Sequence, residues 1–179
     1  MKINLFIDMD GTLVEWRSAT LQELLTPGFF LGGRAYENVV RAVLRLAKNG
    51  SEIAVSTLSA YLEESNTALQ EKNLWLDGIQ FPASNRYFVP IGGTVGKRDA
   101  KVAYVENKLG RALAQTDVLL DDYSVNLHAW AEAGGTAVKL MNGVNGSKGT
   151  WQGPKISRFS EATVIATELE RIAHQAIAA

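Results

Sequence analysis

The sequence contains no cysteine among its 179 residues. Disulfide bonds and catalysis by a thiol are therefore excluded, and the composition is compatible with a reducing compartment. The chain also lacks a long apolar run. No stretch approaches the roughly 20 residues that cross a bilayer, and the apolar segment at the start is too short for a signal peptide. We therefore expect a soluble, cytoplasmic protein that does not associate with membranes.

The chain has no excess of charge of either sign. Its 18 lysines and arginines and its 19 aspartates and glutamates leave a formal net charge of −1. Because acidic and basic residues are interspersed and form no basic stripe, a nucleic-acid polymer is not expected as a partner. The only two histidines, His128 and His174, fall in helix-like segments where surface positions are expected. Capture of a small anion would then depend on lysines, a metal ion and helix N-termini.

Apolar segments of strand length alternate along the chain with helical patterns. The strand candidates are residues 3–7, 53–55, 87–91, 118–120 and 136–141. Helical patterns occupy residues 35–48, about 60 onward, 102–109 and 160–179. This alternation predicts an α/β fold, a parallel sheet with helices on both faces. With 46% hydrophobic residues, the whole chain, residues 1–179, is expected to form a single domain with at most a small accessory cap.

Two carboxylates follow the first strand candidate. Asp8 and Asp10 are separated by one residue, and the chain then turns at Gly11. In such a pair one carboxylate can attack an electrophile while the other gives a proton and later takes one back. These are the roles that hydrolysis through a covalent aspartyl intermediate requires. A structural turn at the end of a strand is the alternative.

Residues 8–12, Asp-Met-Asp-Gly-Thr, resemble the first motif of the haloacid dehalogenase (HAD) superfamily, which reads Asp-x-Asp-x-Thr/Val after an apolar strand. The resemblance implies a Rossmann-like three-layer α/β/α core and phosphoryl chemistry. Such chemistry needs further partners: a hydroxyl, a lysine and more acids. Ligands of these sheets bind beyond the carboxyl ends of the strands, so the partners are expected there.

A hydroxyl that donates to a phosphate oxygen is expected after the second strand candidate. Thr57 is the preferred residue and Ser56 the alternative. A cation that offsets charge on the transferring phosphoryl group should follow later in the chain. Lys97 and Lys101 compete for this role. We prefer Lys101, because Asp99 is a plausible N-cap that places this lysine in the first turn of a helix, pointing toward the loop.

Asp121 and Asp122 repeat the first pattern of an apolar strand, then acids, then a helix start, for which Ser124 is the expected cap. If this strand pairs beside the first, its acids lie about one strand spacing, ~4.8 Å, from Asp8. Carboxylates that close raise each other's pKa unless a cation lies between them. Mg²⁺ suits such a site because it takes few protein carboxylates and accepts a phosphate oxygen. Which of the two acids binds the metal directly stays open, and an Asp-Asp turn capping a helix is the alternative.

Residues 119–151 look like the 5′(3′)-deoxyribonucleotidase-like branch of the HAD superfamily. That resemblance implies that Asp8 is the nucleophile and a metal ligand. It implies that Asp10 is the general acid and base, with a backbone carbonyl that also binds the metal. It further implies that Thr57 and Lys101 contact the phosphate. Asp121, with Asp122 beside it, would complete the metal site.

The resemblance does not cover residues 15–49, a small cap or lid insertion with its following helix. The part up to about residue 34 is expected to cover the site, and it holds three aromatic residues, Trp16, Phe29 and Phe30. One interpretation is a mobile lid whose rings stack on a nucleobase; the other is a loop and short helix that pack the rings into the core. The chain also departs from the branch at Ser59, where its members often have proline, and in its smaller cap.

The sequence therefore predicts a Mg²⁺-dependent phosphatase that hydrolyses a phosphomonoester through an aspartyl phosphate, with a nucleoside monophosphate as the expected substrate. A phosphatase of sugar phosphates or other small metabolites is the close alternative. A noncatalytic phosphate- or nucleotide-binding module is the alternative of another class, and the intact acid pairs argue against it. The sequence does not indicate an oligomeric state.

Overall fold

The computed structural model describes residues 2–49, 52–92, 100–144 and 150–178. In this part of the chain the strands form a six-stranded sheet with the order β3-β2-β1-β4-β5-β6, and every neighbouring pair is parallel. The predicted α/β fold with a parallel sheet is confirmed. The strands are β1 (Ile3–Ile7), β2 (Ile53–Leu62), β3 (Arg86–Ile91), β4 (Asp117–Asp121), β5 (Thr136–Met141) and β6 (Lys155–Ser157).

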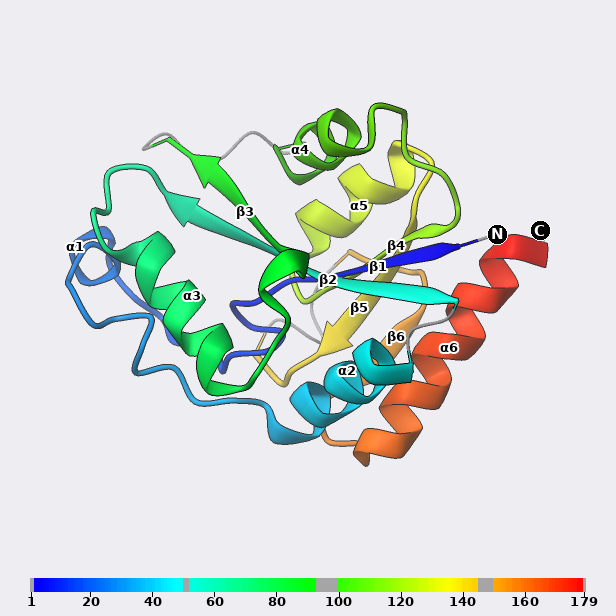
Figure 1. Cartoon of the computed structure of the whole chain (residues 1–179), viewed down its shortest axis with the longest axis horizontal. Helices are drawn as coiled ribbons and strands as arrows, with labels where there is room; N and C mark the ends of the chain where they lie inside the picture. The colour runs from blue at the N-terminus through cyan, green and yellow to red at the C-terminus, as the bar shows by residue number, and fades with distance from the viewer. Residues whose placement is uncertain (1, 50–51, 93–99, 145–149, 179) are drawn as a thin grey trace.

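Helices cover both faces of this sheet (Figure 1). Apolar residues of α2, α3 and α6 pack on one face, and those of α4 and α5 pack on the other. Within the described ranges, no helix has both the length and the apolar character that a membrane crossing requires. The helices are α1 (Leu21–Leu24), α2 (Glu37–Asn49), α3 (Ala68–Gly78), the 3₁₀ helix η1 (Ala83–Asn85), α4 (Ala100–Leu109), α5 (Ser124–Glu132) and α6 (Ala162–Ala178).

The central strand β1 is buried on both sides. Ile3, Leu5 and Ile7 belong to the apolar cluster under α2 and α6, whereas Phe6 belongs to the cluster under α4 and α5. Successive side chains of a strand point to opposite faces, so a strand covered on both faces reads as a nearly continuous apolar run. Asp8 follows directly after this run, which places it at the carboxyl edge of the sheet.

The chain after residue 57 differs from the sequence expectation. The sequence predicts a helix from about residue 60, but β2 continues to Leu62 and α3 begins only at Ala68. Residues 57–62 pair in register with residues 86–91 of β3. The helix prediction is wrong there because a partner strand distant in sequence satisfies the backbone of the extension.

Two smaller predictions also need correction. Ser124 is expected to cap α5, but Tyr123 is the N-cap residue and Ser124 is the first helical residue. The Ser124 hydroxyl instead accepts a hydrogen bond from Lys139 Nζ at 2.7 Å. The sequence pattern does not predict β6, because this strand has only three residues and those at its two ends are polar. Asp99, the expected cap of α4, lies outside the described residues.

Asp117 begins β4, at the opposite end of the strand from Asp121. Each oxygen of its buried carboxylate accepts two hydrogen bonds. Oδ2 accepts from Arg111 Nη1 at 2.6 Å and from the Ala114 backbone nitrogen at 2.8 Å. Oδ1 accepts from Arg111 Nη2 at 2.9 Å and from Asn4 Nδ2 at 2.8 Å. Burial alone would raise the pKa of Asp117, but these donors outweigh it and hold the pKa below its ordinary value.

We expect Asp117→Asn to lower the free energy of unfolding by about 2–4 kcal/mol at pH 7, because an amide nitrogen would then face hydrogen-bond donors. Since the pKa of Asp117 is lowered in the folded state, its contribution is present above the ordinary value of 3.8 and is lost as the pH falls through and below it. The stability difference between wild type and variant should therefore shrink below that pH. Urea denaturation across this pH range measures the difference, with Glu64→Gln, at an exposed carboxylate, as the control. A difference that stays constant would contradict this account.

Candidate active site

The acids that follow β1 and β4 meet at the carboxyl edge of the sheet. The two strands are neighbours with Ile7 in register with Leu120, and the Asp8 backbone nitrogen donates to the Leu120 carbonyl at 2.9 Å. Carboxylate oxygens of Asp8, Asp121 and Asp122 all lie within 4.8 Å of one another, and all three side chains are buried. The structure thus brings together acids that lie more than 110 residues apart in sequence.

Lys101 lies between two of these acids. It comes from the first turn of α4, and its Nζ lies 2.5 Å from Asp8 Oδ1 and 2.7 Å from Asp121 Oδ2. Asp121 is also held by the Tyr123 backbone nitrogen at 2.8 Å and by Asn126 Nδ2 at 2.8 Å. Lys101 therefore lies where the sequence places the lysine of the site. The competing lysine, residue 97, lies outside the described part of the chain.

The cluster carries more negative than positive charge. Burial raises the pKa of Asp8 to about 8, although the charge of Lys101 opposes this shift. Three neighbouring acids act in the same direction as burial: Asp121, Asp10 and Asp122. Burial by itself would lower the pKa of Lys101, but the Asp121 and Asp8 carboxylates outweigh it and raise the pKa. One lysine therefore does not neutralise the acids, and an additional cation would be stabilised among them.

The residues of the cluster fit a hard divalent cation. Mg²⁺ prefers oxygen ligands and is commonly held by one or two carboxylates together with water and a phosphate oxygen. Asp8, Asp121 and Asp122 offer such oxygens close together. Asp122 packs against the first motif, because a Cβ on Gly11, whose φ is +87°, would come within 2.5 Å of Asp122 Oδ2. Asn142 Nδ2 also donates to that oxygen at 2.9 Å.

Two threonine hydroxyls in the described part of the structure are buried without a hydrogen-bond partner. The Thr57 and Thr12 hydroxyl oxygens have no hydrogen-bond partner within the described ranges. Thr57 lies on β2 in register with Ile7, one residue before Asp8. Thr57 and Ser56 are expected to follow the second strand, but both lie within it, because β2 continues to Leu62. Buried hydroxyls are usually hydrogen-bonded, so the unpaired hydroxyl of Thr57, beside the end of β1, suits a ligand oxygen. Ser56, the alternative to Thr57, is buried as well.

The chain matches no known family model and no curated protein. It does resemble solved structures over nearly its whole length. A predicted phosphatase from Clostridium acetobutylicum has a TM-score of 0.65 at 10% identity, covering 96% of this chain and 99% of that one. A HAD family hydrolase from Deinococcus radiodurans, with bound phosphate and sodium, has a TM-score of 0.59 at 14% identity and covers 96% of each chain. The HAD domain of effector protein Lem4 from Legionella pneumophila has a TM-score of 0.55 at 15% identity, covering 98% and 97%.

The fold is that of the HAD hydrolases. At 10–15% identity the likeness concerns the arrangement of strands and helices, and activity must be argued from the site itself. The matches support the HAD part of the sequence resemblance and leave its 5′(3′)-deoxyribonucleotidase-like branch as a proposal. The acids and Lys101 lie together at the carboxyl edge of this sheet, and Thr57 lies beside the end of β1.

Another buried lysine, which the sequence reasoning missed, contacts the first motif. Lys72 lies on α3, and its ammonium contacts the Asp10 carboxylate. Asp10 therefore lies beside the cluster, but its carboxylate contacts a lysine of α3, whereas Asp8 contacts a lysine of α4. The sequence shows only that Lys72 recurs at helical spacing with the apolar residues Ala68, Trp75 and Leu76, and a lysine in such a helix normally lies in solvent.

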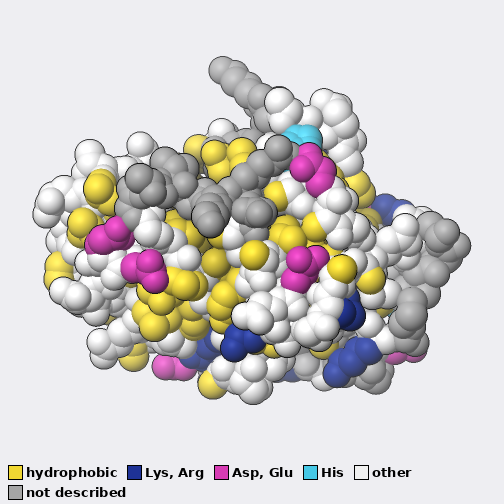
Figure 2. Space-filling model, turned by 90° about the horizontal axis from the view of Figure 1, so that it is seen from above, with side chains coloured by type: hydrophobic (Ala, Val, Ile, Leu, Met, Phe, Trp, Pro, Cys, Tyr) yellow, Lys and Arg dark blue, Asp and Glu magenta, His cyan; other side chains and the backbone are white. Residues whose placement is uncertain are grey.

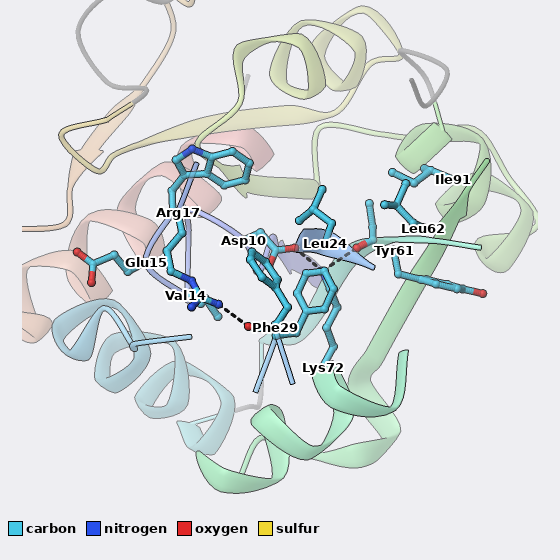
Figure 3. A pocket seen from close by; sticks show the side chains of 13 residues that line it. Asp10, Val14, Glu15, Arg17, Leu24, Phe29, Tyr61, Leu62, Lys72 and Ile91 are labelled. Carbon is cyan, nitrogen blue, oxygen red and sulfur yellow. Dashed lines mark hydrogen bonds and ion pairs between the residues drawn. The ribbon is translucent and has the colours of Figure 1, made fainter. Parts of the chain in front are cut away.

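A cavity of about 210 Å³ opens beside Asp10 (Figure 3). Its walls are mostly apolar, and the residues expected to cover the site, Trp16, Phe29 and Phe30, all line it. The two phenylalanine rings meet edge to face with centroids 5.1 Å apart, and the Arg17 guanidinium lies 4.4 Å from the Phe29 ring centre. The aromatic residues of the insertion therefore form the wall of a cavity next to the proposed acid. The other lining residues are Val14, Glu15, Leu24, Ala60, Tyr61, Leu62, Lys72 and Ile91.

Proposed function

We propose that the protein is a Mg²⁺-dependent phosphomonoesterase that works through an aspartyl phosphate on Asp8. The observation that carries the proposal is the buried cluster of Asp8, Asp121 and Asp122 with Lys101 between two of them. Burying this many charges costs stability, and a bound cation would offset the surplus negative charge that Lys101 leaves. The HAD fold, shared with solved phosphatases and hydrolases, supports the same reaction class.

The two carboxylates of the first motif divide the reaction between them. In the first half, an oxygen of Asp8 attacks phosphorus, the bond between phosphorus and the leaving oxygen breaks, and Asp10 gives that oxygen its proton. In the second half, water attacks the aspartyl phosphate and Asp10 takes the proton of that water. Phosphate leaves, and the Asp8 carboxylate is restored.

The remaining residues bind and neutralise the phosphoryl group. Lys101 Nζ, 2.5 Å from Asp8 Oδ1, places positive charge where the attacking oxygen meets phosphorus. The Thr57 hydroxyl donates to a phosphate oxygen. The carboxylates of Asp8 and of Asp121 or Asp122 would hold Mg²⁺, which would supply charge stabilisation to the phosphoryl group.

The cavity beside Asp10 supports a substrate whose leaving group carries a flat, apolar part. We propose a nucleoside monophosphate, with residues 15–34 as a small cap whose aromatic residues contact the base. A nucleic-acid polymer is not proposed. On the face shown in Figure 2, basic side chains do not form a continuous band that could follow a phosphate backbone.

Hydrolysis of p-nitrophenyl phosphate by the purified protein tests the proposed function. We expect turnover with millimolar Mg²⁺, and removal of divalent ions with EDTA should lower the rate at least about tenfold, with recovery when Mg²⁺ is restored. The absence of turnover, combined with tight binding of phosphate, would instead support a noncatalytic binding module. Turnover that EDTA leaves unchanged would reject the metal.

A screen of phosphorylated metabolites then separates the two candidate substrate classes. Nucleoside 5′- and 3′-monophosphates should have the highest kcat/KM, because their bases fill the aromatic cavity. Higher values for sugar phosphates would favour the small-metabolite phosphatase and would leave the cavity without its proposed occupant.

A further inference from the structure

Lys72 is a buried charge whose hydrogen-bonding capacity is fully used. Its side chain is only 1% exposed. The three N–H bonds of its ammonium have three acceptors: the Asp10 carboxylate, Ser59 Oγ at 2.8 Å and the Ala60 carbonyl at 2.7 Å. The Phe30 ring covers it, with Nζ 4.6 Å from the ring centre. Figure 3 shows the lysine reaching from α3 to Asp10.

Asp10 depends on this lysine for its orientation. Within the described part of the chain, Lys72 is the only side chain that hydrogen-bonds the Asp10 carboxylate, and it does so through Oδ2. The Asp10 side chain is 30% exposed and lines the cavity. A carboxylate in such a position can rotate about two side-chain bonds unless a neighbour fixes one of its oxygens. A proton donor must lie within hydrogen-bond reach of the leaving oxygen, and a displacement of about 1 Å can cost about 100-fold in rate.

We propose that Lys72 is the positioning residue for Asp10, and that it holds this carboxylate in place for proton exchange with the leaving group. The inference rests on the proposed phosphatase function. Replacing a buried ion pair by apolar residues is often neutral or favourable for stability, so stability alone gives little reason to keep a charge at this position of α3.

The helix that carries Lys72 also fixes the wall of the cavity. The Glu71 carboxylate accepts hydrogen bonds from the backbone nitrogens of Gly28 at 2.6 Å and Phe30 at 3.0 Å. One turn later, Trp75 Nε1 donates to the Gly33 carbonyl at 2.8 Å. Neighbouring residues of α3 therefore set the position of Asp10 and the position of the aromatic wall that faces the leaving group.

The role of Lys72 can be separated from that of Lys101. Lys101 comes from α4 and contacts Asp8 and Asp121, whereas Lys72 comes from α3 and contacts Asp10. A lysine that positions the acid should matter most for substrates whose leaving group needs a proton. It should matter little for binding of the phosphoryl group itself.

The test compares Lys72→Met with wild type on phenyl phosphate, which has a basic leaving group, and p-nitrophenyl phosphate, which does not. Since kcat/KM reports only on steps up to departure of the leaving group, we expect it to fall about 100-fold for phenyl phosphate and about fivefold or less for p-nitrophenyl phosphate. Inhibition by orthovanadate, a phosphate analogue, should change less than about twofold, because Lys72 does not contact the phosphoryl site. Lys108→Met, at an exposed lysine of α4, is the matched control and should leave all values unchanged.

Ser59→Ala provides a second variant if Lys72→Met does not fold. It removes one acceptor of the Lys72 ammonium and keeps the charge, so kcat/KM should fall about tenfold with phenyl phosphate and about twofold or less with p-nitrophenyl phosphate. An equal loss on both substrates, or no loss, in a folded variant would overturn the positioning role while leaving the phosphatase intact. A wild-type protein that hydrolyses neither phosphate would instead reject the proposed function, and the role of Lys72 with it.

Discussion

Asp8→Asn should lower kcat by at least about 10⁴-fold, because an amide cannot attack phosphorus to form the covalent intermediate. The replacement keeps the shape of the side chain, and its oxygen can still accept the hydrogen bond that Lys101 now donates at 2.5 Å to Asp8. The loss should therefore appear in turnover with little change in the far-UV circular dichroism spectrum. Steady-state release of phosphate measures it.

A trapping experiment makes the test of Asp8 specific. Acid-quenched wild-type protein should carry a phosphoryl group on the peptide that contains residue 8, detected by mass spectrometry, and the Asp8→Asn protein should carry none. Asp77→Asn applies the same chemical change to a largely exposed carboxylate of α3 and should leave kcat unchanged. Normal hydrolysis by Asp8→Asn protein would reject this residue as the nucleophile.

Lys101→Met should reduce kcat/KM by about 10³-fold, because it removes the positive charge that lies between Asp8 and Asp121. The loss should be similar for phenyl and p-nitrophenyl phosphate, since the charge acts on the phosphoryl group and not on the leaving group. Affinity for orthovanadate should fall as well. This pattern is the opposite of the one expected for Lys72→Met, so the two variants distinguish the two lysines.

The Lys101 variant should also lose stability. Two buried carboxylates are left without their ammonium partner, and breaking a buried pair in this way costs about 3–5 kcal/mol. Urea denaturation without divalent ions measures this loss, and Mg²⁺ should restore part of it if the acids hold the metal. A fully active Lys101→Met protein would show that this lysine does not serve the phosphoryl group.

The sequence predicted the edge of the sheet at which the acids meet because each acid follows directly after an apolar strand. Side chains that leave parallel strands at their carboxyl ends share one edge, so Asp8 and Asp121 could be placed together from the sequence. Lys101 could be placed for the same kind of reason, since it lies in the first turn of the helix that follows the third strand. These predictions needed only local pattern and the parallel topology.

Other features depend on contacts that a linear pattern does not contain. The extension of β2 to Leu62 exists because β3 pairs with it, and neither segment alone specifies that register. Lys72 shows the same limit, because a lysine in an amphipathic helix normally lies in solvent. It becomes informative only when Asp10 and Ser59 are found within reach. The departure from the resembled branch at Ser59, which the sequence shows but does not explain, coincides with a hydrogen bond to this lysine.

The hydrogen bonds from the backbone of the insertion to Glu71 affect how this protein could acquire new substrate specificities. The carboxylate holds main-chain nitrogens at positions 28 and 30, groups that every amino acid except proline supplies. The aromatic residues at positions 29 and 30 could therefore be replaced by other side chains while the backbone of the loop keeps its conformation. Natural or engineered substitutions there could change which leaving groups bind without altering the catalytic residues.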